Sequence, residues 1–129
     1  MAKSKEAAKL STLEEYRQAV SADPKSAPAH ANLGWEFYGE GNWAEAVSAF
    51  NQALSLDPSL VDAQYGLAMA QKSAGAKVEA VAAFEKAIAL TANLDDAARG
   101  KVLARLARGH INQLQSGHWE LTNILGGEL

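Results

Sequence analysis

Two pairs of side chains with binding chemistry occur at helical spacing. Trp35 and Tyr38 are three residues apart, and Tyr65 and Met69 are four residues apart. Residues at these separations share one face of a helix. Aromatic residues and methionine are enriched in the energetically important centres of protein interfaces and on adaptable binding surfaces. The pattern therefore indicates binding of another molecule rather than a chemical reaction.

Three basic residues near the C-terminal end form a second pattern. Lys101, Arg105 and Arg108 are four and three residues apart, so they occupy one stripe of a helix. Together with Lys72, the two arginines would favour partners that carry acidic residues. The alternative for this stripe is a solvated outer face, since lysine and arginine are common on the outer surface of terminal helices.

The histidines give little support to catalysis or metal binding. His30 and His110 lie on apolar stripes, which is typical of structural histidines, and His118 lacks a second ligand four residues away. The chain has no cysteine, no Walker sequence and no GxGxxG, and its serines have no recognisable nucleophile context. We therefore expect no enzyme, no catalytic residue, no cofactor and no metal. A metal-binding or catalytic role of the C-terminal histidines is the remote alternative.

The composition describes an all-α chain. Its 129 residues fit one domain, and 48% of them are hydrophobic, which excludes intrinsic disorder. Alanine, the best helix former, is abundant, whereas β-branched residues are few. A net charge of −3 lacks the positive footprint of a nucleic-acid-binding protein. No apolar run reaches the roughly 20 residues that span a membrane, and without cysteines or an export signal we expect a cytoplasmic protein.

The elements that must position these residues are helices. Apolar residues recur every three to four positions, and glycine, asparagine and Asp-Pro pairs interrupt them. Ser59 is a candidate N-cap, and the acidic pair Asp95 and Asp96 suits the start of a helix about two turns longer than its counterparts. The predicted helices cover about residues 5–22, 59–74, 77–90, 95–114 and 119–125, together with one helix that contains His30, Leu33 and Phe37 and one that contains Val47, Phe50 and Leu54.

Two segments of the chain repeat one another. Residues 27–60 superpose on residues 61–94, so that Phe50 falls on Phe84 and the turn glycines coincide. One period earlier, Tyr16 takes the position of Phe50. A fixed period of this length is typical of helical arrays in which each helix pair buries its apolar face against the next pair. Small residues that would let the paired helices approach closely are Gly34, Ala46, Ala68 and Ala80.

The repeating unit resembles the tetratricopeptide repeat. That family's pattern is a hydrophobic residue, leucine and glycine in the first helix, then an aromatic residue, a turn glycine, alanine, phenylalanine, alanine and proline. Residues 61–94 depart from it at Gln71, which replaces the aromatic residue, and at Ala92, which replaces the proline; residues after 95 match poorly. Residues 27–60 match the pattern at Leu33, Gly34, Phe37, Gly41, Ala46, Phe50, Ala53 and Pro58.

The resemblance implies a fold and its division. We expect an all-α, right-handed α-solenoid of antiparallel helix pairs with about six to seven helices, forming a single domain of residues 1–129. Within it, a half repeat covers residues 5–24, and full repeats cover residues 27–60 and 61–94. Residues 95–125 would form a long helix and a short capping helix.

The resemblance also implies a function, that of a protein–protein interaction module or scaffold. In the family, the first helix of each repeat lines a concave groove that holds a peptide or helix of a partner protein. Arg105 and Arg108 would form a basic far wall of this groove and favour acidic partners. The groove positions of the first two repeats are occupied here by Trp35, Tyr38, Tyr65, Met69 and Lys72.

The sequence disfavours one further function and leaves two other interpretations open. A clamp for the C-terminal carboxylate of chaperone tails, present in some family members, is absent here. Ala31 and Trp35, or in the other frame Asp62 and Gly66, stand where its lysine, arginine or asparagine side chains are needed. Trp35 and Tyr38 could instead pack against neighbouring helices, including a long C-terminal helix folded into the groove.

Self-association is the alternative function. The N-terminal helix lacks a partner helix of its own repeat, which leaves one flank of the solenoid uncapped. Leu10, Leu13 and Val20 could dock on a second copy of the chain and produce a symmetric homodimer.

Overall fold

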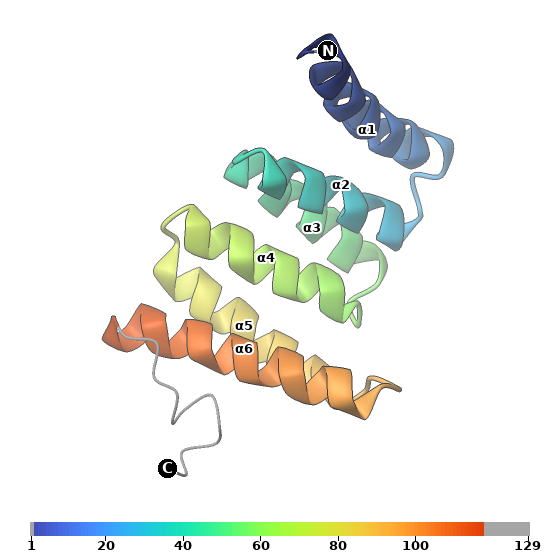
Figure 1. The fold of residues 1–129 in the computed structure, drawn as a ribbon. Coiled ribbons are helices and arrows are strands. Elements are labelled where there is room, and N and C mark those ends of the chain that lie inside the picture. Colours follow the sequence, from blue (N-terminus) through green and yellow to red (C-terminus); the bar gives the residue numbers. More distant parts are fainter. Residues whose placement is uncertain (1, 118–129) are drawn as a thin grey trace.

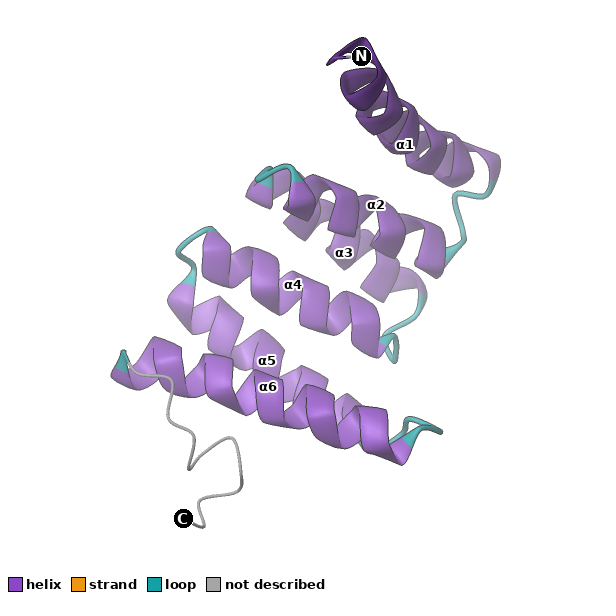
Figure 2. Ribbon diagram, in the orientation of Figure 1, coloured by secondary structure: helices purple, strands orange, loops and turns teal. Residues whose placement is uncertain are grey.

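The structure is a computed structural model that describes the backbone of residues 2–117 and the side chains of residues 12–117. Within that range it consists of six α-helices and contains no strand, which confirms the all-α prediction (Figure 2). The capping helix predicted at residues 119–125 lies outside the described residues. The helices are α1 (Ala2–Ala22), α2 (Ala27–Gly39), α3 (Trp43–Leu56), α4 (Val61–Ser73), α5 (Lys77–Thr91) and α6 (Ala97–Ser116).

Successive helices run antiparallel and stack side by side into an α-solenoid (Figure 1). The pairs α2–α3 and α4–α5 share one arrangement, and α6 packs on α5. In the view of Figure 1, α2, α4 and α6 form a front layer, and α3 and α5 lie behind it. The predicted solenoid of antiparallel helix pairs is confirmed. As expected, α6 is longer, with 20 residues against 13 in α2 and in α4.

Side-chain caps explain where two of the helices, α2 and α6, begin. Ser26 Oγ and the Asp96 carboxylate each accept a hydrogen bond from the backbone N–H three residues further on, at 3.2 and 3.0 Å. The prediction of an N-cap at Ser59 is wrong. Ser59 donates from its backbone N–H and from its hydroxyl to the Asp57 carboxylate, at 3.0 and 2.7 Å, so its side chain is not available to α4. The N-cap of α4 is Leu60.

Phe50 and Phe84 are the largest fully buried side chains of the described residues, as the repeat pattern predicts. A Cβ atom on Gly34 would lie 2.8 Å from the ring of Phe50, and one on Gly66 would lie closer still. Phe50 therefore fills a space between α2 and α4 that only glycine leaves open. The repeat period does not indicate the role of Gly66, because the equivalent position in the first repeat is Asn32.

Candidate binding surface

The helix α2 presents Trp35 and Tyr38 on one face, with their ring centroids 5.7 Å apart in an edge-to-face arrangement. Trp35 also lies edge-on to the buried Phe50, at 5.1 Å between centroids. Its indole N–H donates a hydrogen bond to the Asp62 carboxylate on α4, at 3.0 Å. Tyr38 packs against Trp43 at the start of α3, at 5.2 Å. Both side chains are half-buried, so they are held from the core side and still reach the surface.

The next first helix, α4, continues this surface with Tyr65 and Met69, which are also half-buried and pack against the core. Tyr65 lies edge-on to Phe84, at 5.7 Å between ring centroids. Burial raises the pKa of the Tyr65 hydroxyl above 10.0, and the charge of an ionised Tyr38 raises it further.

Lys72 connects α4 to α6 at the edge of this surface. Its ammonium group donates hydrogen bonds to His110 Nδ1, at 2.8 Å, and to Gln113 Oε1, at 2.5 Å. Since an ammonium group has only donors, Nδ1 accepts and the ring proton lies on Nε2. The His110 ring stacks on Phe84, with 5.0 Å between centroids and 8° between planes. His110 is therefore a structural residue, as the apolar stripe predicts.

The same contacts shift the titration of both groups. Burial, assisted by the positive charge of Lys72, lowers the pKa of His110 to about 4. Burial also lowers the pKa of Lys72. At neutral pH, the imidazole of His110 is therefore uncharged. Lys72 is the one lysine or arginine of α4, and it follows Met69 by three residues.

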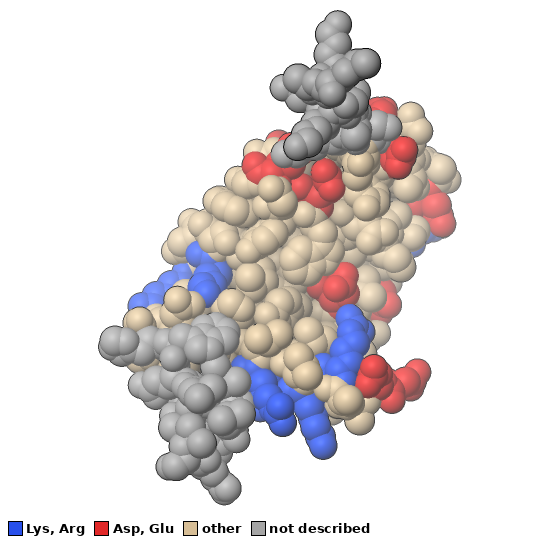
Figure 3. Space-filling view, viewed as in Figure 1, with Lys and Arg blue, Asp and Glu red and all other residues tan. Residues whose placement is uncertain are grey.

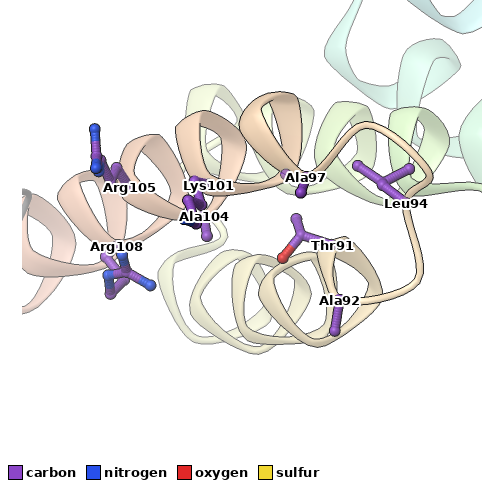
Figure 4. A pocket seen from close by; sticks show the side chains of 9 residues that line it. Thr91, Ala92, Leu94, Ala97, Lys101, Ala104, Arg105 and Arg108 are labelled. Atoms are coloured by element: carbon purple, nitrogen blue, oxygen red, sulfur yellow. The ribbon is translucent and has the colours of Figure 1, made fainter.

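Arg105 and Arg108 do not take part in the contact between α4 and α6 that Lys72 makes. Around the axis of α6, Lys101 and Arg108 lie about half a turn from His110, the residue that contacts α4. All three basic side chains are exposed and line a cleft between α6 and the end of α5 (Figure 4). We call the surface formed by Trp35, Tyr38, Tyr65, Met69 and Lys72 the groove face; the arginines lie beyond its edge.

Two large apolar residues of α6 are exposed, although other apolar side chains of the helix pack inward. Val102 is 50% exposed and Leu106 is 38% exposed. They precede His110 by eight and four residues, so they lie on the side of α6 that turns toward α4. Spacing to His110 is the signal that could have identified them.

Charges are unevenly distributed over this side of the molecule. Figure 3 shows an uncharged central region, with most visible acidic side chains over the α1–α2 end and most basic ones over the α4–α6 end. The helix α6 contains Arg99, Lys101, Arg105 and Arg108 and no acidic residue, whereas α2 contains Glu36 and no basic residue. A bound segment would therefore meet opposite charges at the two ends of the groove face.

The remaining predictions concern the N-terminal helix and the histidines. Leu13 packs against the core, and Val20 lines a cleft with residues of α2 and α3, so part of the face offered to a second copy is used within the chain. The side chain of Leu10 and all of His118 lie outside the described residues. The homodimer stays a prediction. Within residues 12–117, no group of three or more histidine or acidic residues is arranged to hold a metal ion.

His30 has a structural role that its apolar stripe predicts. It is buried, and its Nε2 lies 2.8 Å from the carbonyl oxygen of Pro24, to which it donates a hydrogen bond. In the part of the chain that the structure describes, none of the helices is both long and apolar enough to cross a membrane.

Comparison with known proteins gave matches at the level of family and fold. A family model for the tetratricopeptide repeat matches residues 13–59 and 31–95. The chain is similar to the TPR2B-domain:pHsp70 complex of yeast Sti1, with a TM-score of 0.67 and 20% identity over 80% of this chain and 85% of that chain. Comparison with curated protein sequences gave no match.

Two structures of MamA are also similar to this chain. Their TM-scores are both 0.65, at 23% and 24% sequence identity. The similarity covers 89% and 90% of this chain but only 66% and 62% of the two MamA chains. Identities this low establish a common fold and carry no information about a shared ligand.

Proposed function

The chain belongs to the tetratricopeptide repeat family, and on this premise we propose that it binds a peptide or helix of a partner protein on its groove face. The fold supports a protein–protein interaction scaffold in general. Binding at Trp35, Tyr38, Tyr65, Met69 and Lys72 is the specific part of the proposal. In this role the protein acts by binding and not by catalysis.

The observation that carries the proposal is the double role of the aromatic side chains. Trp35 and Tyr65 each lie edge-on to a fully buried phenylalanine, and each remains partly exposed. A hydrogen bond from Trp35 to Asp62 further restricts the indole ring. Side chains that are already ordered lose little conformational entropy on binding, so they can contribute more of their contact energy to affinity. The half-buried Met69 adds an adaptable contact.

Charge determines which partners this surface favours. Lys72 lies at the edge of the groove face, where its ammonium group would bind an acidic side chain or a terminal carboxylate of the bound segment. Arg105 and Arg108 line the cleft between α5 and α6, so they act on such a partner through their longer-range field, which decays over a Debye length of about 8 Å at physiological salt. The expected ligand therefore has apolar anchors followed by acidic residues.

The complex of the yeast TPR2B domain with pHsp70 supports a protein or peptide as the partner. The ligand of this chain would differ from a chaperone tail held by a carboxylate clamp. Trp35 and Asp62 occupy positions at which that clamp needs basic or amide side chains, and here they hydrogen-bond to each other instead.

The proposal is tested with captured partners and matched variants. The full chain is immobilised, proteins bound from the native lysate are identified by mass spectrometry, and the affinity of a purified partner is then measured. Trp35→Ala with Tyr65→Ala should weaken binding at least about tenfold, which corresponds to about 1.4 kcal/mol. Tyr65→Phe, which keeps the ring beside Phe84, should retain most of the affinity.

A control removes apolar area elsewhere. Leu56 on α3 and Val78 on α5 are exposed at 38% and 79%, away from the groove face. Leu56→Ala with Val78→Ala should leave the affinity unchanged. If the aromatic double variant is folded by circular dichroism and binds as well as the parent chain, the groove face is not the binding site.

A further inference from the structure

A cleft of about 450 Å³ lies at the end of the solenoid, between α6 and the C-terminal end of α5 (Figure 4). Thr91 and Ala92 contribute one side of it, and Leu94 lies in the connection between the helices. Its other side is formed by α6, where Ala97 and Ala104 are small and apolar. The floor of the cleft therefore contains small apolar side chains beside polar and basic ones, and no described helix covers it.

The two helices approach closely at one end of this cleft. A Cβ atom on Gly100 would lie 2.9 Å from the carbonyl oxygen of Thr91, so the absence of a side chain at Gly100 allows the contact. The walls of the cleft are thus two packed helices and not mobile loops. A preformed surface of this kind needs little rearrangement to bind another segment.

The rim of the cleft is basic. Lys101, Arg105 and Arg108 follow one another along α6 at spacings of four and three residues, and all three are exposed. The helix α6 carries no acidic residue. Among the described residues, none of these three side chains forms an ion pair or hydrogen bond with a carboxylate. The three positive charges are therefore available to a ligand.

This surface is separate from the groove face. His110 and Gln113 turn toward α4, where they accept hydrogen bonds from Lys72. Lys101 and Arg108 lie about half a turn away around the same helix. A ligand in the cleft would consequently contact α5 and α6, and a ligand on the groove face would contact α2 and α4.

We infer that the α5–α6 cleft is a second docking site, which binds an acidic amphipathic helix of a partner protein. The apolar side of such a helix would cover Ala97 and Ala104. Lys101 to Arg108 spans about 10 Å of helix, which is two turns. Glutamate or aspartate residues three or four apart on the bound helix match the spacing of the three cations.

The small apolar side chains of the floor favour a protein segment over a nucleic acid. Backbone phosphates placed over Ala97 and Ala104 would lose hydration without gaining hydrogen bonds there. The chain as a whole, with this basic stripe included, carries a net charge of −3. A polyanion longer than the stripe would therefore meet repulsion outside it.

The test uses the full chain and a defined probe. The probe is a fluorescein-labelled helical peptide of about four turns, with leucines along one face and glutamates on both sides of it. Fluorescence anisotropy should show saturable binding that weakens as salt is raised. Replacing the glutamates of the probe by lysines should abolish binding.

Charge reversal in the protein locates the site. Lys101→Glu, Arg105→Glu and Arg108→Glu together should weaken binding of the probe at least about tenfold, because three attractive contacts become repulsive. Arg105→Gln with Arg108→Gln removes charge without adding repulsion and should give a smaller loss. Circular dichroism should show unchanged helix content in both variants, since these side chains are exposed.

The matched control carries the same change of net charge elsewhere. Lys25, Lys77 and Lys86 are exposed and lie outside α6. Lys25→Glu, Lys77→Glu and Lys86→Glu together should change binding of the probe less than about twofold. Equal losses in the two triple variants would overturn the inference, because the probe would then respond only to net charge.

Three further outcomes would also overturn it. Loss of binding in the Trp35→Ala, Tyr65→Ala variant would place the probe on the groove face. Failure of the full chain to bind the probe would mean that the cleft is not open to a partner, whether residues 118–129 or a second copy cover it. Stronger binding of an RNA oligonucleotide than of the probe, lost in the α6 triple variant, would assign the surface to a different class of ligand.

Discussion

Two clefts in the solenoid are built from equivalent positions of the two repeats, yet their side chains differ in kind. The first lies where α1, α2 and α3 meet and includes His30 and Phe37. The second lies where α3, α4 and α5 meet, and Gln64 and Gln71 take the equivalent positions. Backbone geometry is thus repeated, while the filling of the space changes from aromatic to polar.

The two glutamines of the second cleft differ in their hydrogen bonding. Gln64 is 6% exposed, and its Nε2 donates a hydrogen bond to the carbonyl oxygen of Ala83, at 3.1 Å. Gln71 replaces a buried phenylalanine, and its Oε1 is buried with no hydrogen-bond partner among the described residues. A repeated backbone position therefore does not guarantee a repeated environment, because a polar side chain also needs a partner.

The largest expected effect compares Phe37 with Gln71 directly. Phe37→Ala should lower the free energy of unfolding by about 3–5 kcal/mol, because it removes a buried ring. Gln71→Ala should lower it by less than about 1 kcal/mol, since the lost packing is offset by removal of an unpaired carbonyl. Urea unfolding followed by circular dichroism measures both values. Equal losses would mean that the two positions are equivalent in energy after all.

The second prediction concerns the junction between the repeats. Gly34→Ala and Gly66→Ala both force a Cβ atom against the ring of Phe50, and each should lower the free energy of unfolding by about 1–3 kcal/mol. Gly39→Ala is the control, because a Cβ atom there would meet nothing within 4 Å. It should leave the melting temperature unchanged or raise it slightly. If Gly66→Ala left the free energy of unfolding unchanged, that result would contradict the close approach of Gly66 to the ring of Phe50.

The third prediction uses pH to separate the two repeats. The first repeat contacts the next one through Trp35 and Asp62, whereas the second contacts α6 through Lys72 and His110. Because the pKa of His110 is lowered to about 4 from 6.5, the unfolded chain binds a proton before the folded chain does. Stability should therefore fall as pH decreases from about 6.5 to about 4, by about 1–2 kcal/mol after allowance for solvent screening.

His110→Gln provides the reference for this measurement. The variant lacks the titrating imidazole, so the difference in unfolding free energy between parent chain and variant should shrink as pH is lowered through this window. Other carboxylates titrate equally in both chains and cancel in the difference. A difference that does not vary with pH would show that His110 titrates normally in the folded protein.

The smallest expected effect is a gain in stability. Gln71→Leu should raise the free energy of unfolding by about 1 kcal/mol, because it replaces a buried carbonyl that has no partner with apolar volume. Phe37→Leu in the first repeat is the matched control and should lower it. Thermal unfolding of both variants gives the sign, and a loss of stability in Gln71→Leu would indicate that the amide has a partner in solution.

Much of the fold could be predicted from local pattern. The spacing of apolar residues, the turn glycines and the Asp-Pro pairs indicated the six described helices, because each depends on contacts within a few turns. The offset between residues 27–60 and 61–94 indicated that Phe50 and Phe84 fill equivalent junctions. The start of α4 was misplaced at Ser59, since Asp57 competes for the same hydroxyl.

The candidate site was only partly predictable. Spacing placed Trp35 beside Tyr38, and both are on one face as expected. It could not show that Asp62 accepts a hydrogen bond from Trp35, or that Lys72 reaches His110, because these partners are 27 and 38 residues apart in sequence. The exposure of Val102 and Leu106 could not be predicted from spacing either, because it depends on which helices pack against α6.

The sequence by itself determined the helices, their repeat and the family, because helical periodicity and a fixed repeat length are properties of the chain order. Only the tertiary structure decided on which side of α6 each residue lies. That helix is two turns longer than α2 and α4, so the repeat period no longer relates its positions to theirs. Its packing angle places His110 against Lys72 and leaves Arg105 and Arg108 over a separate cleft. Side chains that share one stripe are evident from spacing, but the surface that the stripe faces depends on the neighbouring helices.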